Sequence, residues 1–137
     1  MGRKTLAAVV VAALVVGGGW FAYRYARTVV HDSYAVWWVA DLTIEHLKAN
    51  DGAWPKGWDD LSDDYETFTA THGRPWSFEE LRSRVAVDWN ADPKQLATLA
   101  ANGEKFRVIR LTDGSDYHYQ GREPNEMIGR FLCEKQQ

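Results

Sequence analysis

The stretch "LAAVVVAALVVGGGWFAY", residues 6–23, contains eighteen consecutive positions without a charged side chain. In a helix these positions extend for about 27 Å, close to the hydrocarbon thickness of a bilayer. The stretch therefore predicts a single transmembrane helix that contacts the lipid bilayer through residues 6–23. Trp20, Phe21, Tyr23 and Tyr25 lie at its C-terminal end, which is typical of side chains at the headgroup boundary.

A cleaved secretory signal is the alternative interpretation of the same segment. Arg3 and Lys4 form a positive leader, Leu6–Val16 has the length of a signal's apolar part, and Gly17 and Gly19 are small enough for a cleavage site. The aromatic cluster that follows favours a retained anchor, because interfacial aromatic side chains are a feature of helices that stay in the membrane.

The distribution of charge divides the chain into two parts. Residues 1–27 hold four basic and no acidic residues, whereas residues 28–137 hold twelve basic and nineteen acidic residues, a net charge of −7. This balance gives the second part no bulk attraction for nucleic acid. We expect an anchor over residues 1–27 with a cytoplasmic N-terminus, and a small extracytoplasmic domain over residues 28–137.

An amphipathic helix is predicted to follow the anchor, from about Ser33 to Ala49. Trp37, Ala40, Ile44 and Leu47 recur at spacings of three and four, and Tyr34, Trp38 and Leu42 broaden the same apolar surface. The segment "RYARTVVHD" between the two helices contains no proline or glycine, so one continuous helix is possible. A break after Val30, with Ser33 capping a new helix, is the other possibility.

The next stretch, "NDGAWPKGWDDL" over residues 50–61, places two tryptophans in a predicted loop. Gly52 suits the left-handed conformation that ends a helix, and Trp54 before Pro55 is biased toward extended geometry. We expect Trp54 and Trp58 to fold back and pack against the domain, because buried tryptophans contribute large apolar areas. The alternative is an exposed aromatic recognition surface.

The remaining sequence predicts an α+β domain. Short helices are expected over residues 77–85 and 92–101 and from Pro124 or Asn125 onward, a strand over residues 85–89, and a hairpin within residues 105–121 that turns at Asp113-Gly114. The acidic residues of "DDLSDDYETF", residues 59–68, favour a short helical start, and residues 62–76 are the least regular part and are expected to form a surface loop. Together these elements predict a small, mainly antiparallel sheet of about three strands packed with short helices.

The first half of the chain resembles type IV pilins and type II secretion pseudopilins. The resemblance covers roughly residues 5–61 and is carried by the apolar helix, the following helix, the motif N-x-G-x-W-P at residues 50–55 and W-x-x-L at residues 58–61. Pilin-like helices carry a glutamate in their apolar segment, whereas the apolar segment of this chain contains none and Gly2 is followed by "RKTLAAVV". The resemblance implies a helix that emerges from the membrane and carries an extracytoplasmic domain. The segment "YHYQGREPNEMI", residues 117–128, also resembles small single-span bacterial membrane proteins of unassigned activity.

Candidate catalytic and metal-binding residues do not form a recognised motif. The four histidines are scattered without HExxH spacing, and the glycines at 17–19 lack the lysine of a phosphate-binding loop. Two acidic groups offer oxygen ligands but do not match the EF-hand spacing, so helix-start and turn roles are favoured for them. The single cysteine is expected to be a small apolar residue on the last helix. These residues are His31, His46, His72, His118, Asp59, Asp60, Asp63, Asp64, Asp113, Asp116 and Cys133.

Two functions are compatible with these features. The first is a noncatalytic, membrane-anchored interaction or assembly module of the cell envelope, with an envelope protein as its partner and with no catalytic, cofactor-binding or metal-binding residues. The second is a secreted or tethered protein that binds a small molecule or a metal, or hydrolyses a substrate, through the acidic loop and His118. We favour the first, because the anchor and the aromatic-rich domain are the strongest signals in the sequence.

Overall fold

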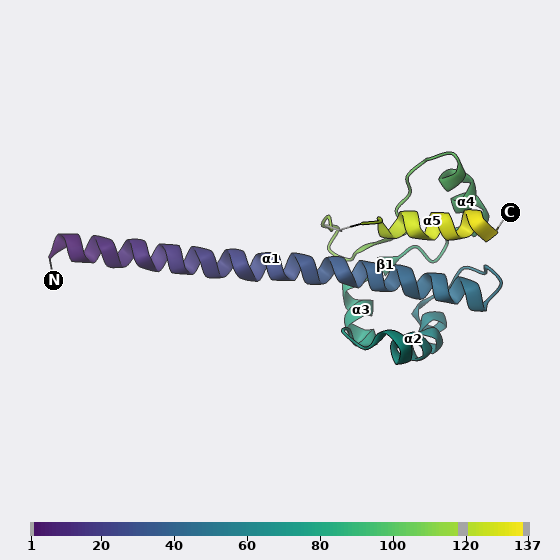
Figure 1. Cartoon of the computed structure of the whole chain (residues 1–137), viewed down its shortest axis with the longest axis horizontal. Helices are drawn as coiled ribbons and strands as arrows, with labels where there is room; N and C mark the ends of the chain where they lie inside the picture. The colour runs from purple at the N-terminus through teal and green to yellow at the C-terminus, as the bar shows by residue number, and fades with distance from the viewer. Residues whose placement is uncertain (1, 118–120, 136–137) are drawn as a thin grey trace.

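The computed structural model describes residues 2–117 and 121–135 and confirms the α+β class. Its helices and strands, in chain order, are α1 (Arg3–Ala49), α2 (Trp58–His72), α3 (Phe78–Arg84), β1 (Val85–Val87), α4 (Pro93–Ala101), β2 (Ile109–Leu111) and α5 (Pro124–Lys135). All of them except the first part of α1 gather into one body at the C-terminal end of that helix (Figure 1).

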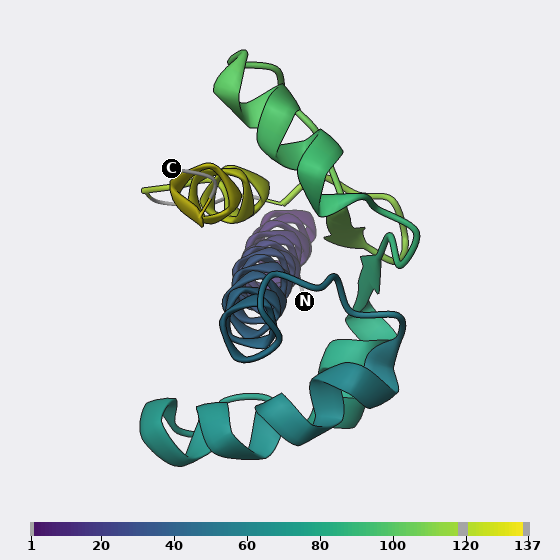
Figure 2. The same ribbon diagram turned by 90° about the vertical axis from the view of Figure 1, so that its right-hand side faces the viewer.

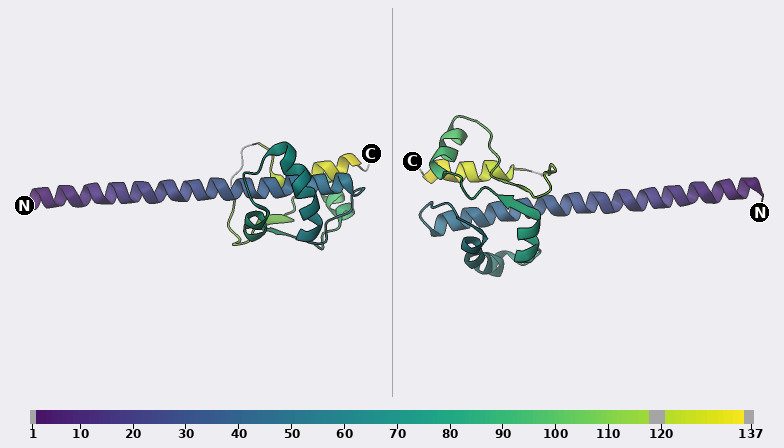
Figure 3. Two further views of the ribbon diagram at one scale, coloured as in Figure 1. Left: turned by 90° about the horizontal axis from the view of Figure 1, so that it is seen from below. Right: turned by 180° about the vertical axis from the view of Figure 1, so that it is seen from behind.

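Helix α1 is the longest element and joins the two parts of the chain. It contains 47 residues and is therefore about 70 Å long. Its N-terminal part projects alone from the domain (Figure 3), and the most apolar window of the helix is not buried by other residues. This part is long and apolar enough to cross a membrane. The helix continues through Val29–Ser33, so of the two possibilities the continuous helix is the one that forms, and the alternative break after Val30 does not occur.

The domain is built around the C-terminal part of α1. Viewed along this helix, α2 and α3 lie on one side, and α4 and α5 lie on the other (Figure 2). Packing on two sides explains why the structure does not confirm the single apolar stripe that the sequence predicted. Tyr34 keeps 60% of its surface exposed, and Trp37, Trp38 and Ile44 are half-buried. The fully buried apolar positions of this part are Ala35, Val36, Val39, Ala40, Leu42 and Leu47.

The tryptophan-rich loop packs against the domain. Gly52 has a φ of 85° and donates its N–H to the Leu47 carbonyl at 2.7 Å, as expected for a left-handed helix end. Trp54 is buried, and its Nε1 donates to the Asp88 carbonyl at 2.8 Å. Trp58 is half-buried in edge contacts with Phe78 and Trp89. The prediction that both tryptophans pack inward is therefore confirmed for Trp54 and for the aromatic cluster around Trp58.

The prediction of an irregular loop over residues 62–76 is wrong for most of that segment. Residues 58–72 form α2, because Leu61, Tyr65 and Phe68 recur at spacings of four and three and are buried. The short helical start expected from the acidic residues does form, with Asp59 and Asp60 in the first turn, but the helix runs on to His72. Helix α2 is joined to α1 by a hydrogen bond in which His46 Nδ1 lies 2.6 Å from Asp64 Oδ2.

The sheet differs from the predicted hairpin. The two strands pair antiparallel with Val85 opposite Leu111 and Val87 opposite Ile109, so β2 pairs with a strand that precedes it in the chain. Asp113-Gly114 lies in a turn, as predicted, but residues 114–117 do not form the returning strand. The last part of the predicted hairpin lies at residues 118–120, outside the described residues. Strand β2 pairs with β1 and also contacts α1, and local turn chemistry does not report such long-range contacts.

The helix ends follow the sequence signals closely. Ser77 and Glu80 form the predicted capping box at the start of α3. Asp92 caps α4 by accepting from the N–H of Lys94 at 2.9 Å, and Gly103 ends that helix with a φ of 72°. These caps and the glycine at the helix end determine where α3 and α4 begin and end.

Candidate functional site

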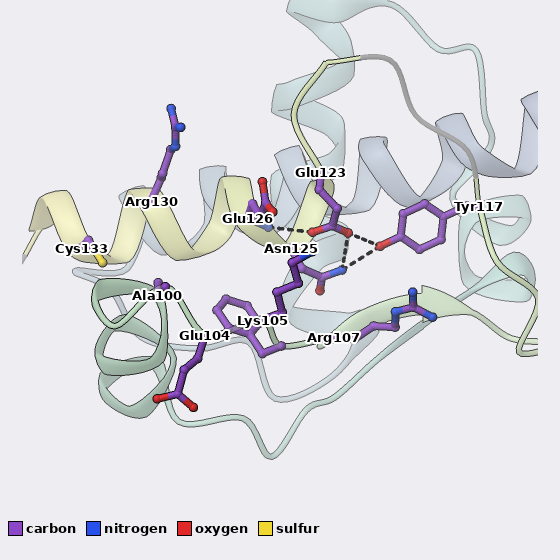
Figure 4. Close-up of a pocket in the computed structure, with 12 residues that line it drawn as sticks. Ala100, Glu104, Lys105, Arg107, Tyr117, Glu123, Asn125, Glu126, Arg130 and Cys133 are labelled. Carbon is purple, nitrogen blue, oxygen red and sulfur yellow. Dashed lines mark hydrogen bonds between the residues drawn. The ribbon is translucent and has the colours of Figure 1, made fainter.

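A pocket of about 570 Å³ lies between α5 and the segment that connects α4 to β2 (Figure 4). One wall is the first half of α5, and the other is the chain from Gly103 to Arg107 with the ring of Tyr117 at one end. Both walls carry charged side chains. The twelve lining residues are Ala100, Gly103, Glu104, Lys105, Phe106, Arg107, Tyr117, Glu123, Asn125, Glu126, Arg130 and Cys133.

Asn125 connects the pocket to the sheet. Its side chain is almost fully buried, and Oδ1 accepts from the backbone N–H groups of Val108 at 2.8 Å and Ile109 at 2.9 Å. Its Nδ2 donates to the Ile109 carbonyl at 3.1 Å and to the Tyr117 hydroxyl at 2.8 Å. One amide therefore satisfies backbone groups at the start of β2 and fastens that strand to α5.

Glu123 and Tyr117 complete this network. The Tyr117 hydroxyl donates to Glu123 Oε1, which also accepts from Asn125 Nδ2 at 3.0 Å (Figure 4). Glu123 Oε2 accepts from the backbone N–H of Glu126 at 2.9 Å and so caps the start of α5. Burial raises the pKa of the Tyr117 hydroxyl, and the hydrogen bond to Glu123 raises that pKa further. The phenol is therefore protonated at neutral pH and acts as a hydrogen-bond donor, not as a base.

The rim of the pocket carries both signs of charge. Arg107 forms an ion pair with Asp116 at 3.2 Å, and its guanidinium lies 5.7 Å from the centre of the Tyr117 ring. Lys105 and Arg130 are exposed and form no ion pair within the described part of the chain. Glu104 and Glu126 are exposed on the same rim. A mixed rim of this kind suits a ligand that carries complementary charges of both signs.

The floor of the pocket is a close contact between α4 and α5. Gly129 is buried, and a Cβ at this position would lie 2.9 Å from the Cβ of Ala100 and 3.1 Å from the ring of Phe106. Cys133 lies on the last helix, as predicted, and its Sγ is 3.3 Å from the Ala97 carbonyl. Glycine therefore sets how closely the two helices that shape the pocket approach.

Four of the acidic residues that the sequence singled out have separate local partners, namely Asp60, Asp64, Asp113 and Asp116. Asp60 accepts from the backbone N–H of Lys56 at 2.8 Å, whereas Asp64 pairs with His46. Asp113 accepts from the N–H and hydroxyl of Ser115, which together hold the pKa of its carboxyl below the usual value. Within residues 2–117 and 121–135, no three His, Cys, Asp or Glu side chains gather as a metal site.

The histidines are also spread across the structure. His31 lies 3.6 Å from Trp76 between ring centres, and His72 stacks on Phe68 at the end of α2. His46 is buried in the α1–α2 interface. The proposed role of His118 lies outside the described residues.

Comparison with known proteins gives no assignment, since neither a family model, nor a curated protein, nor a solved structure matches the chain.

The sequence did not predict the pocket, because its lining residues come from three separate segments and form no motif. The one available signal was the pair Glu123 and Asn125 on either side of Pro124, at a predicted helix start.

Proposed function

We propose that the chain is a single-pass membrane protein whose domain, residues 28–137, binds a partner protein of the cell envelope without catalysing a reaction. The observation that carries this proposal is the continuity of α1. One helix supplies both the apolar segment and the central element of the domain core. A domain held on such a rod has a fixed height above the bilayer, which suits a module that positions another protein.

The orientation belongs to the same proposal. We place the N-terminus in the cytoplasm and the domain outside it, which follows the charge distribution and the pilin-like order of the first sixty residues. The lone projecting part of α1 (Figure 1) supports a helix that leaves the membrane and enters an extracytoplasmic domain. Filament assembly is not included, because the apolar segment lacks the glutamate of pilin-like helices.

The pocket between α4 and α5 is the proposed partner surface. It is an open site whose rim carries Lys105, Arg130, Glu104 and Glu126, which form no ion pair among residues 2–117 and 121–135, and Phe106 is among its lining residues. These features fit a peptide segment that carries an apolar side chain between charged ones. The hydrogen-bonding groups of Asn125 and Glu123 are used inside the fold, so recognition would rest on the rim.

A small-molecule ligand is the second candidate for the same pocket. Its volume of about 570 Å³ lies in the range that drug-sized ligands occupy. This candidate predicts that mass spectrometry of the denatured, purified protein detects a stoichiometric small molecule. It also predicts that removing that molecule lowers the unfolding temperature.

Site-specific photocrosslinking in native membranes tests the partner proposal. A benzoylphenylalanine at Lys105 or Arg130 samples the pocket rim, and one at Thr71 samples the exposed face of α2 on the opposite side of α1 (Figure 2). We expect one discrete protein adduct from the two rim positions and none from Thr71. Equal adducts from all three positions, or none from the rim, would contradict a partner surface at the pocket.

A further inference from the structure

A second cavity, of about 340 Å³, lies where α1 enters the domain and is lined from two directions. Six of its lining residues come from α1, and Arg84 comes from the C-terminal end of α3. The α1 residues are Trp20, Tyr23, Arg24, Arg27, Thr28 and His31. Positions 20, 24, 27 and 31 are separated by four, three and four residues, so they share one helix face.

The charges in this cavity are not balanced. Arg84 forms an ion pair with Asp32 and lies over the buried ring of Trp76. Arg24 and Arg27 are exposed and have no acidic partner among residues 2–117 and 121–135. Two like charges three residues apart on a helix repel one another. An anion between them would remove that repulsion.

The position of the cavity along α1 indicates which anion it meets. The apolar segment ends at Tyr23, and Arg27 lies only four residues, or about 6 Å, further along the helix. If residues 6–23 span the bilayer, both arginines lie in the headgroup layer, with the rings of Trp20 and Tyr23 at its boundary. The phosphate of a phospholipid is the anion that is concentrated in this layer.

We propose that this cavity binds the phosphate of an anionic phospholipid, with Arg24 and Arg27 as its charged donors and Trp20 and Tyr23 against the glycerol region. Guanidinium groups match phosphate oxygens in a bidentate geometry. Arg84 belongs to the domain, so a headgroup held here contacts both the anchor and the domain and fixes how the domain faces the membrane. This inference rests on the proposed membrane insertion of α1.

The test places the full chain in bilayers that contain equal amounts of phosphatidylcholine and phosphatidylglycerol. Mass spectrometry then identifies the lipids that remain bound to the protein after mild extraction. We expect phosphatidylglycerol to be enriched about fivefold over phosphatidylcholine in the unmodified protein. The double variant Arg24→Gln/Arg27→Gln should lose this enrichment. The control Lys56→Gln/Lys94→Gln removes two exposed charges far from the span and should retain it.

Several results would overturn the proposal. The first is an absence of enrichment in the unmodified protein, and the second is equal enrichment in both double variants. The third is displacement of the lipid by an excess of inorganic phosphate, which would indicate a site for free phosphate. Extraction of the membranes with alkaline carbonate separates this proposal from the previous one. A protein that stays in the membrane but shows no lipid preference refutes only the lipid site, whereas a protein released by carbonate refutes the anchor as well.

Discussion

Replacing Asn125 with alanine tests the network that joins the pocket to the core. The substitution removes the acceptor of two buried backbone N–H groups, those of Val108 and Ile109, and the donor to the Ile109 carbonyl. A buried donor left without a partner costs about 1–3 kcal/mol, so the two N–H groups together cost about 2–6 kcal/mol. The lower end applies if water from the adjacent pocket reaches them.

The assay is thermal unfolding of the full chain in nanodiscs, followed by tryptophan fluorescence. For a domain of this size 1 kcal/mol corresponds to about 4 °C, so the midpoint of Asn125→Ala should fall by at least about 8 °C. The matched control is Asn90→Ala, at an exposed turn position, which should change the midpoint by less than about 2 °C. If Asn125→Ala unfolds within about 2 °C of the unmodified protein, Asn125 does not hold β2 to α5 in the way described.

Three further substitutions test other contacts. Gly129→Ala should destabilise the domain by about 1–3 kcal/mol in chemical denaturation, because its Cβ overlaps Ala100 of α4 and the ring of Phe106, whereas Gly57→Ala meets nothing within 4 Å and should cost less than about 1 kcal/mol, the loss expected for alanine at the N-cap of α2. Asp64→Ala should cost about 1–2 kcal/mol by removing the carboxylate that contacts the buried His46 of α1, whose Nδ1 then keeps only its contact with Asn50 Nδ2 at 3.2 Å; the exposed neighbour Asp63 serves as the control, and equal effects would contradict the His46–Asp64 contact. Burial raises the pKa of the Asp41 carboxyl above its usual 3.8. The folded state therefore favours the protonated carboxyl, and the stability that this form contributes is lost as pH rises through the folded pKa. Asp41→Asn should therefore raise the unfolding midpoint at pH 7, and the difference should vanish below about pH 4; a variant that is less stable at pH 7 would contradict this.

Local signals in the sequence predicted the helix ends well. Ser77 with Glu80, Asp92 before Pro93, and Gly52 act through neighbours within a few residues, so their partners are visible in the sequence. The Asp113-Gly114 turn was also found, because its conformation depends on its own residues.

Features that depend on distant partners were not predictable in the same way. The pairing of β2 with β1 and the burial of α1 on two sides result from tertiary packing. The pocket gathers Lys105, Tyr117 and Asn125 from segments that only the fold brings together. No periodicity or motif marks such a set, and it became visible only with the arrangement of α4, β2 and α5.

The most direct test of the account measures whether α1 is one rigid helix from the membrane into the domain. Spin labels at Ala22 and Lys48, two exposed positions 26 residues apart, should lie about 39 Å apart along the helix. The measurement is double electron–electron resonance on the full chain in nanodiscs, with Cys133→Ser to leave only the two introduced thiols. We expect a single narrow distribution centred near that distance. A broad distribution, or one centred well below it, would place a hinge between the apolar segment and the domain and contradict the rigid anchor.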